Sequence, residues 1–378
     1  MSKNILQVIP NLNFGGIEKC VAIMNKYLVK NGYNSFILTN EGQMIFKITE
    51  DGGKVIKLDI ATKNPIKMFF NISKIKKILV ENKIDLVDVT SRAPAISIFF
   101  ACKALKIPFI TTMHGNYSTG FLKNWYNSFM SEGNYIICVS NYIKQVALKR
   151  YDAFRAKYYE GKVVVVPRGV DENIFAPQKD NFVRIISTLN NLSLPQDKQI
   201  ILLPGRFTDW KGQLYILDVF KKVKNKDWIC LMVGDFSKHP EYKKRVEAKI
   251  KKLGLYNFIR IEKASNDMTA LYSIANIVIS SSIRGESFGL VSVEAQAMEK
   301  VIIATALGAS LETIIDEKTG FLANVDDIDN FASIIDKVLE MPTEEKEKIG
   351  RQARENVLEN YTIEKMCRDT LEVYNRLI

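Results

Sequence analysis

Short runs of β-branched and other apolar residues alternate with amphipathic stretches along the chain, and the alternation begins twice. The first series of apolar runs is NILQVI (4–9), NSFILTN, KVIKLD, IDLVDV, PFITTM, YIICVS and KVVVVP. The second follows a polar segment at 177–197 and comprises QIILLPG (199–205), WICLMVGD, FIRIEK, IVISSS, KVIIAT and GFLAN. Strands that alternate with helices indicate βαβ units and parallel sheets. We therefore predict an α/β protein with two Rossmann-like βαβ domains, one at 1–176 and one at 177–359.

Length and composition support two soluble domains and exclude several other classes. A chain of 378 residues with 47% hydrophobic and 25% charged residues is neither disordered nor fibrous. Its longest apolar stretch, about 93–102, is too short to span a bilayer, and we expect no secretory signal. Five cysteines lie far apart, which predicts reduced thiols and a cytoplasmic protein. Two histidines make a histidine-based metal cluster improbable.

The positive charge is confined to one half of the chain. Residues 1–168 hold 24 Lys/Arg against 11 Asp/Glu, a net charge of +13, whereas residues 169–378 hold 29 against 31, a net −2. This asymmetry suggests an anionic partner, which could be nucleic acid, an anionic membrane surface or a phosphorylated acceptor. A generally lysine-rich composition explains the number of lysines, but explains less well why only one half is basic.

In open α/β sheets, ligands bind beyond the carboxyl ends of the strands, so residues there are candidates for a site. Gly15 and Gly16 follow the first strand and could admit a phosphate, although a tight turn is the favoured interpretation of this pair taken alone. His114 follows PFITTM, where a capping or core role is the alternative. Arg206 and Lys211 follow the strand ILLPG and could converge on one polyanion; the alternative is solvated surface charge.

The segment SSSIRGESFGLVSVEAQAM (280–298) carries the strongest signal. We expect a loop that carries Glu286, followed by a helix that begins at Phe288-Gly289-Leu290 and carries Glu294. The two glutamates are eight residues apart, so about two helical turns at most would align them along one face. Free amides at the start of this helix could bind a diphosphate, while the carboxylates could accept hydrogen bonds from sugar hydroxyls. The alternative is a capping carboxylate and an exposed glutamate. Because Glu294 lies among Val and Ala residues, we expect it to have a partner.

These segments together resemble the retaining GT-B glycosyltransferases of family four, group 1. The similarity includes E-x7-E at Glu286 and Glu294, and it extends over essentially the whole chain. It also includes, in order, GGIEK (15–19), GRFTDWKG, VGD (233–235) and TALGASLETI-DEKTGFL. DVTSRAPA (88–95) and HGNY (114–117) are similar to segments of bacterial lipopolysaccharide-core enzymes, although Asp88 stands where we expect histidine, and Arg284-Gly285 also departs from the family pattern.

The resemblance implies two domains facing across a cleft, with the terminal helix 360–378 crossing back onto the first, acceptor-binding domain. The second domain, 177–359, would bind the nucleotide sugar. Gly15 and Gly16 would lie against the donor diphosphate, and His114 would contact the donor sugar. Arg206 and Lys211 would neutralise the leaving diphosphate. Glu286 would hold sugar hydroxyls with the amides of Phe288, Gly289 and Leu290, and Glu294 would bind the ribose.

The expected reaction is retaining transfer of a sugar from a nucleotide-diphosphate sugar to a lipopolysaccharide-core or other cell-envelope glycan or lipid acceptor. Because Arg206, Lys211 and a helix N-terminus supply positive potential, we expect no metal and no other cofactor. A 2-epimerase-like enzyme on the same fold is the alternative. A basic nucleic-acid-binding protein is a weaker one, since the chain lacks RNP aromatics and zinc spacing, and we expect no nucleic-acid partner.

The segment from Lys63 to Lys83 combines apolar residues with a basic flank. On a helix, Ile66, Phe69 and Phe70 would lie near several lysines, which is typical of a membrane-surface helix. We therefore expect the enzyme to be peripheral on the inner face of the cytoplasmic membrane. The alternative is that Ile66, Phe69 and Ile78 pack on the sheet.

Overall fold

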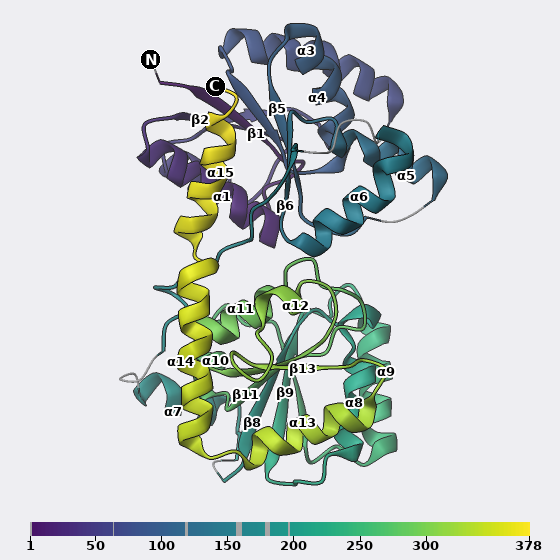
Figure 1. Ribbon diagram of the computed structural model, residues 1–378, viewed down its shortest axis with the longest axis vertical. Helices are drawn as coiled ribbons and strands as arrows, with labels where there is room; N and C mark the ends of the chain where they lie inside the picture. Colours follow the sequence, from purple (N-terminus) through teal and green to yellow (C-terminus); the bar gives the residue numbers. More distant parts are fainter. Residues whose placement is uncertain (1, 63, 118–119, 156–160, 178–181, 196) are drawn as a thin grey trace. The chain divides into compact units, whose positions relative to one another are not determined.

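The computed structural model describes residues 2–62, 64–117, 120–155, 161–177, 182–195 and 197–378, without the side chains of 151–155 and 182. The chain forms two compact units, and each is an α/β sandwich (Figure 1). The first unit is Met1–Arg168 together with Ile363–Ile378, and the second is Gly169–Thr362. The predicted alternation of strands and helices is confirmed in both units. Within the described residues, no helix is both long and apolar enough to span a membrane.

The first unit has a parallel seven-stranded sheet in the order β3-β2-β1-β4-β5-β6-β7. Its strands are β1 (Asn4–Val8), β2 (Asn34–Thr39), β3 (Lys54–Lys57), β4 (Leu86–Val89), β5 (Phe109–Met113), β6 (Tyr135–Cys138) and β7 (Val163–Val165). The helices are α1 (Gly16–Lys30), α2 (Ile45–Glu50), α3 (Pro65–Glu81), α4 (Arg92–Leu105), α5 (Phe121–Asn127), the 3₁₀ helix η1 (Ser128–Ser131), α6 (Asn141–Arg155) and the C-terminal α15 (Ile363–Asn375). Helices α1 and α15 pack beside each other on one face, and α3 packs beside α4.

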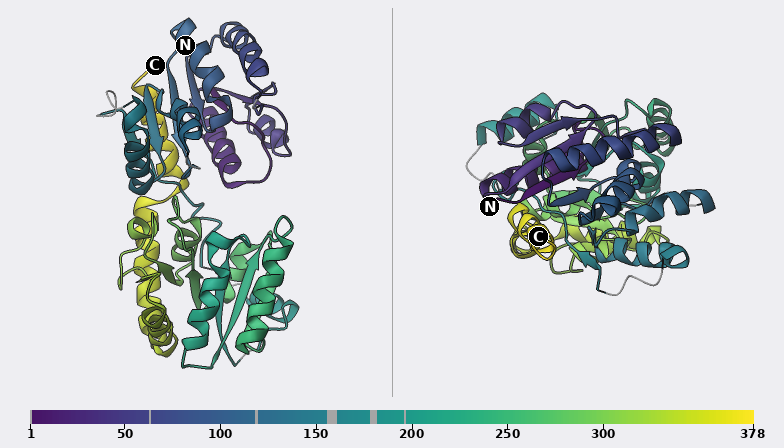
Figure 2. Two further views of the ribbon diagram at one scale, coloured as in Figure 1. Left: turned by 90° about the vertical axis from the view of Figure 1, so that its right-hand side faces the viewer. Right: turned by 90° about the horizontal axis from the view of Figure 1, so that it is seen from above.

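The second unit has a parallel six-stranded sheet in the order β10-β9-β8-β11-β12-β13, with helices on both faces (Figure 2). The strands are β8 (Gln199–Pro204), β9 (Trp228–Gly234), β10 (Ile259–Lys263), β11 (Ile277–Ser280), β12 (Val301–Thr305) and β13 (Phe321–Ala323). The helices are α7 (Phe182–Asn191), the 3₁₀ helix η3 (Asp209–Lys211), α8 (Gln213–Lys222), α9 (Pro240–Leu253), α10 (Met268–Ile274), α11 (Leu290–Ala297), α12 (Ser310–Thr313), α13 (Ile328–Glu340) and α14 (Thr343–Asn360).

Alternation along each central strand divides the second unit's core into two layers. Ile201 and Leu203 of β8 join one buried cluster with Phe220 and Phe331, whereas Ile200 and Leu202 join the cluster on the other face. Successive side chains of a strand point to opposite faces, so strands covered on both sides must be apolar throughout. This explains why the runs ILLP and WICLMVG contain almost no polar residue.

The border between the units lies between Arg168 and Gly169 rather than after residue 176. Residues that follow Arg168 are held by the second unit: Arg354 donates to the carbonyl oxygens of Phe175 and Glu172, at 3.0 and 3.3 Å. The ring of Phe175 also contacts that of Tyr272. The C-terminal segment is likewise divided, because α14 ends at Asn360 in the second unit and α15 begins at Ile363 in the first.

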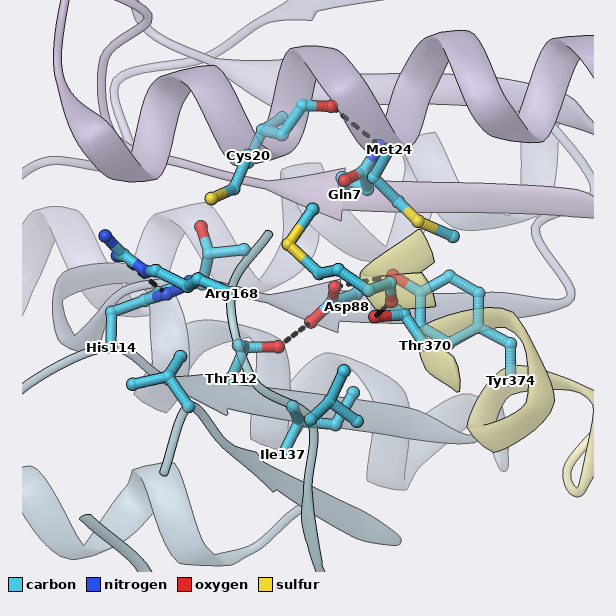
Figure 3. A pocket seen from close by; sticks show the side chains of 15 residues that line it. Gln7, Cys20, Met24, Asp88, Thr112, His114, Ile137, Arg168, Thr370 and Tyr374 are labelled. Atoms are coloured by element: carbon cyan, nitrogen blue, oxygen red, sulfur yellow. Dashed lines mark hydrogen bonds between the residues drawn. The ribbon is translucent and has the colours of Figure 1, made fainter. Parts of the chain in front are cut away.

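Helix α15 is attached to the first sheet by apolar packing and by one buried polar cluster. Cys367, Val373 and Tyr374 pack against Ile5 and Leu86 of the sheet. Each such side chain contributes roughly 1.5–3 kcal/mol when fully buried. The Tyr374 hydroxyl donates to Asp88 Oδ2 at 2.6 Å, and the Thr112 hydroxyl donates to Oδ1 at 3.0 Å (Figure 3). The clustered groups link β4, β5 and α15.

Asp88 is ionisable and only 4% exposed, so its charge opposes folding. Burial raises its pKa to about 6, against the lowering effect of the two hydroxyl donors. Between the unfolded value near 3.8 and the folded value, the folded state holds a proton that the unfolded state has lost. The contribution of Asp88 to stability is therefore most favourable at low pH and is lost as the pH rises through this window.

We expect Asp88→Asn to raise the free energy of unfolding at pH 7.5 by about 2–3 kcal/mol, because the amide removes the buried charge and can still hydrogen-bond both hydroxyls. The difference in the free energy of unfolding between the variant and the wild type should vanish toward pH 4. Urea unfolding across pH 4–8 measures this, with the exposed Asp59→Asn as the matched control. A variant that is less stable than the wild type at every pH would show that the carboxylate's hydrogen bonds outweigh its desolvation.

Candidate active site

The second sheet changes its direction of growth between β8 and β11. From β8 the chain adds β9 and β10 on one side, then returns to place β11 on the other side. The loops that leave these two neighbouring strands therefore diverge to opposite faces, and such switch points are where open α/β sheets bind their ligands. Arg206 and Lys211 follow β8, and Glu286 follows β11. The two sequence segments with the strongest signals thus meet at the switch point.

An ion pair joins the two segments. Lys211 Nζ lies 2.6 Å from Glu286 Oε1, and the two side chains are only 16% and 11% exposed. The Ser282 hydroxyl donates to the same carboxylate oxygen. Lys211 Nζ also lies 4.5 Å from the centre of the Trp210 ring. The lysine is thus held in place by a carboxylate and an aromatic face at the end of the sheet.

Two glycines allow the chain to come close around this pair. Gly212 has φ of +75°, and a Cβ there would lie 1.9 Å from the Ser281 carbonyl oxygen. Gly308 has φ of +62°, and a Cβ there would lie 2.6 Å from the Glu286 carbonyl oxygen. That carbonyl also accepts from the Ala309 amide at 2.9 Å. The backbone of Glu286 is therefore fixed by the loop after β12, and Lys211 by the loop after β11.

Helix α11 begins after this loop and presents an open N-terminus. It starts at Leu290 with Gly289 as its N-cap, in the left-handed region at φ of 83°, and no described side chain caps it. The first-turn amides of a helix have no partner within it and attract anions. Phe288 is buried and its ring contacts Tyr361, so its packing holds the loop before α11 in place.

The predicted loop with Glu286 and the predicted helix with Glu294 are both confirmed, although helical periodicity does not relate the two carboxylates because Glu286 precedes the helix. Glu286 lies in the loop before α11, which begins at Leu290 with Gly289 as its N-cap. Glu294 does lie on the helix, and the expected partner exists: the Tyr272 hydroxyl donates to Glu294 Oε2 at 2.8 Å. Burial, then the Glu294 charge, raise the pKa of Tyr272 well above its usual value, so it remains a hydroxyl donor.

Arg206 differs from Lys211 in its surroundings. It is exposed, and within the described residues its guanidinium forms no ion pair. Its carbonyl oxygen accepts from Gln213 Nε2 at 3.0 Å, which fixes its backbone at the end of β8. Its charge also reaches the end of β9: hydrogen bonds from Ser237 lower the pKa of Asp235, and the Arg206 charge contributes to the lowering. The side chain is thus a cation available to a ligand.

The first unit carries the remaining predicted residues. Gly15 is the N-cap of α1 and Gly16 is the first residue of that helix. A Cβ on Gly15 would lie 2.2 Å from Glu18 Oε2, so the glutamate of GGIEK lies against the backbone there. The position at a helix N-terminus suits a carboxylate. The structure therefore places an internal anion, which the sequence interpretation did not name, beside the predicted phosphate-binding turn.

His114 follows β5 and lines a cavity of about 50 Å³ inside the first unit (Figure 3). Its Nδ1 lies 3.1 Å from an Nη atom of Arg168, whereas its buried Nε2 has no hydrogen-bond partner among the described residues. Burial, and secondly the Arg168 charge, hold the pKa of His114 well below its ordinary value, so the ring is neutral. Asp88, Cys20 and Tyr374 line the same cavity.

Several residues at these sites were not singled out from the sequence. Arg168 and Tyr272 lie far along the chain from the groups they contact, so only the fold reveals them. Ser282 belongs to a serine run that was interpreted simply as the end of a strand. Glu18 stands within the GGIEK segment, and its position in the first turn of a helix was the available signal.

The arrangement agrees with comparisons to known proteins. Residues 14–174 match the family described as Glycosyltransferase Family 4, and residues 187–356 match Glycosyl transferases group 1. A glycosyltransferase from Rickettsia africae ESF-5 has 35% sequence identity and a TM-score of 0.90, covering 100% of this chain and 98% of that one.

Curated relatives act on different substrates. The trehalose synthase of Thermococcus litoralis is 27% identical over 380 residues, or 96% of this chain and 85% of the relative. The lipopolysaccharide 1,2-N-acetylglucosaminetransferase of Salmonella typhimurium is 26% identical over 227 residues, which are 57% of this chain and 58% of that relative. The chain belongs to the group 1 glycosyltransferases of family 4, has the GT-B fold, and is a hexosyltransferase-type enzyme.

Proposed function

We propose that this enzyme transfers a sugar, with retention of configuration, from a nucleotide-diphosphate sugar to a lipopolysaccharide-core or other cell-envelope glycan or lipid acceptor. The observation that carries the proposal is the Lys211–Glu286 pair beside the open N-terminus of α11. Two cations and a helix N-terminus at one sheet edge suit a diphosphate. The lipopolysaccharide transferase among the relatives supports the class of acceptor.

The chemistry requires stabilisation of a leaving diphosphate. The bond between the anomeric carbon and the phosphate oxygen breaks, and its electron pair goes to that oxygen. Lys211, Arg206 and the amides of Gly289 and Leu290 would stabilise the charge that develops there. Glu286 would accept hydrogen bonds from sugar hydroxyls, Glu294 would bind the ribose, and Gly15 and Gly16 would lie against the diphosphate.

We propose a same-face displacement for the retention. The acceptor hydroxyl attacks the anomeric carbon on the side that the diphosphate leaves, and its proton passes to the departing phosphate oxygen. His114, which is neutral, would donate a hydrogen bond to the donor sugar. The transition state carries positive charge on the sugar, and fixed dipoles can stabilise the separated charges without reorganising.

Replacing Lys211 by alanine should lower kcat by about 10²–10³-fold, because a preorganised positive charge at the leaving group is lost. Steady-state rates with a nucleotide sugar and a glycan acceptor measure the effect. Lys222→Ala is the matched control, since that lysine is 52% exposed and pairs with Asp329 at the surface. Near-normal turnover of a folded Lys211→Ala enzyme would remove the lysine from the reaction.

The nature of the donor can be determined on the free enzyme. In a thermal-shift screen of nucleoside diphosphates and their sugars, the compounds that bind should raise the Tm of the wild type. The same compounds should raise the Tm of Lys211→Ala by less. Incubation with the sugar nucleotide alone separates the alternatives, because a 2-epimerase-like enzyme would turn it over without an acceptor. Conversion of the sugar nucleotide in the absence of an acceptor would contradict the transferase proposal and favour the 2-epimerase-like alternative.

The proposed reaction needs no metal, because protein cations and a helix N-terminus provide the charge that a divalent ion supplies elsewhere. We expect activity to be unchanged after treatment with EDTA and exhaustive dialysis. Loss of activity that returns on adding Mg²⁺ or Mn²⁺ would contradict this part of the proposal.

We also propose that the first unit binds the inner face of the cytoplasmic membrane. Helix α3 buries Met68, Ile75 and Leu79, so the helix is anchored without Ile66, Phe69 and Phe70. The latter three are 68%, 72% and 61% exposed, which contradicts the alternative that Ile66 and Phe69 pack on the sheet.

Two neighbouring helices expose further large apolar side chains. The Ser97 hydroxyl of α4 donates to the Met68 carbonyl oxygen of α3 at 3.0 Å, so the two helices touch near the exposed aromatics. Phe100 of α4 and Trp125 of α5 are exposed, and both rings contact Phe129. Exposed lysines lie on the same three helices, namely Lys67, Lys74, Lys77, Lys103 and Lys123. Apolar side chains with a basic surround suit an anionic bilayer, at about 1 kcal/mol per lysine.

The triple variant Ile66→Ser, Phe69→Ser and Phe70→Ser should lose co-sedimentation with anionic liposomes at low salt, while the wild type binds and is released by salt. Val183→Ser with Ile186→Ser is the control, because these apolar residues are also exposed but lie on α7 of the second unit. Equal binding of wild type to neutral and anionic vesicles, or no binding at all, would exclude the membrane proposal and leave the transferase proposal unaffected.

A further inference from the structure

In the hydrogen bond between Arg168 and His114, the chemistry of the two side chains decides which one is the donor. An Nη atom of Arg168 lies 3.1 Å from Nδ1 of His114 (Figure 3). A guanidinium has five N–H donors and no acceptor, and it keeps its charge in proteins. Nδ1 must therefore be the acceptor. A neutral imidazole that accepts on Nδ1 carries its hydrogen on Nε2.

The surroundings of the ring keep it neutral. Burial and the Arg168 charge both disfavour the imidazolium. The other titratable groups on the cavity are Cys20 from α1, Asp88 from β4 and Tyr374 from α15. Asp88 is engaged by the Tyr374 and Thr112 hydroxyls, and burial raises the pKa of Cys20 and of Tyr374.

The hydrogen on Nε2 has no acceptor within the described part of the chain. Nε2 is buried and unpartnered, and so is Nε of Arg168. Leaving a buried donor unsatisfied costs roughly 1–3 kcal/mol, so native proteins seldom keep one without a reason. The cavity of about 50 Å³ beside the ring has room for water. The geometry fits a donor that receives its acceptor oxygen from a ligand.

We propose that Arg168 is a positioning residue that fixes His114 as the neutral tautomer with its proton on Nε2, ready to donate to a ligand oxygen. Such a ring donates without removing a proton from the reacting groups. The inference rests on the proposed function only for the source of that oxygen, which we take to be a hydroxyl of the donor sugar. The tautomer itself is a property of the free enzyme.

Nitrogen NMR of protein labelled with ¹⁵N in its histidine rings tests the inference, because the chain has only two histidines. The second, His239, is exposed at the start of α9 in the other unit and serves as an internal control. His239→Gln assigns the spectrum. We expect His114 to show one protonated nitrogen, Nε2, and one bare nitrogen, Nδ1, unchanged from pH 5.5 to 8.

Arg168→Met removes the donors and the charge while keeping an unbranched side chain. In this variant we expect the His114 ring no longer to be held in one neutral tautomer. Both tautomers, or the imidazolium, should appear within the same pH range. Arg168→Lys keeps a cationic donor and should restore much of the wild-type spectrum. An unchanged His239 signal and Tm show that each variant is folded.

Two results would overturn the inference: a wild-type His114 that titrates or carries its proton on Nδ1, and an Arg168→Met variant that keeps the wild-type tautomer. In transfer assays, Arg168→Met should introduce an acidic limb in kcat/KM that the wild type lacks over this pH range. The expected spectrum in an enzyme without transferase activity would instead refute the proposed function and leave the role of Arg168 standing.

Discussion

The carboxyl ends of parallel strands meet at one edge of a sheet, and this constraint determines where the charged groups of the candidate active site lie. In the second unit the growth of the sheet reverses between β8 and β11, so the segments with Lys211 and Glu286 become neighbours although they are far apart in sequence. In the first unit the reversal lies between β1 and β4, and Gln7 is paired in register with Asp88 there. Polar side chains in both sheets gather where the apolar strands end.

The Lys211–Glu286 pair carries a desolvation cost that an exposed pair does not, because both side chains are nearly buried. The structure offsets this cost through geometry: Ser282 donates to the carboxylate, and two glycines let the backbone approach closely on either side. A pair held this firmly adds little to stability and much to the definition of a site. Charges that are already in place need no reorganisation when an anion arrives.

Much of the fold could be predicted from the sequence, because strands covered on both faces must be apolar throughout and helices between them must be amphipathic. The border at Arg168 was harder, since the segment after it forms no helix or strand of its own, and it is held in the second unit by residues far along the chain such as Arg354 and Tyr272. The site was predictable where residues belong to one segment, as with the need of Glu294 for a partner. The site could not be predicted where a partner comes from another strand or helix, as with Tyr272 and Arg168, because the periodicity of the sequence carries no information on such contacts.

The cavity of the first unit contains two buried polar groups that the protein treats differently. Asp88 has both carboxylate oxygens satisfied by hydroxyls, one of them from the C-terminal helix, so its polarity is used to attach α15 to the sheet. His114 has one ring nitrogen satisfied by a permanent cation and the other left without a partner among the described residues. Burial makes a missing hydrogen bond costly, so a group left unsatisfied in this way differs in kind from one that is satisfied internally. The first belongs to the architecture of the unit, and the second is the group through which we propose that this cavity binds a ligand.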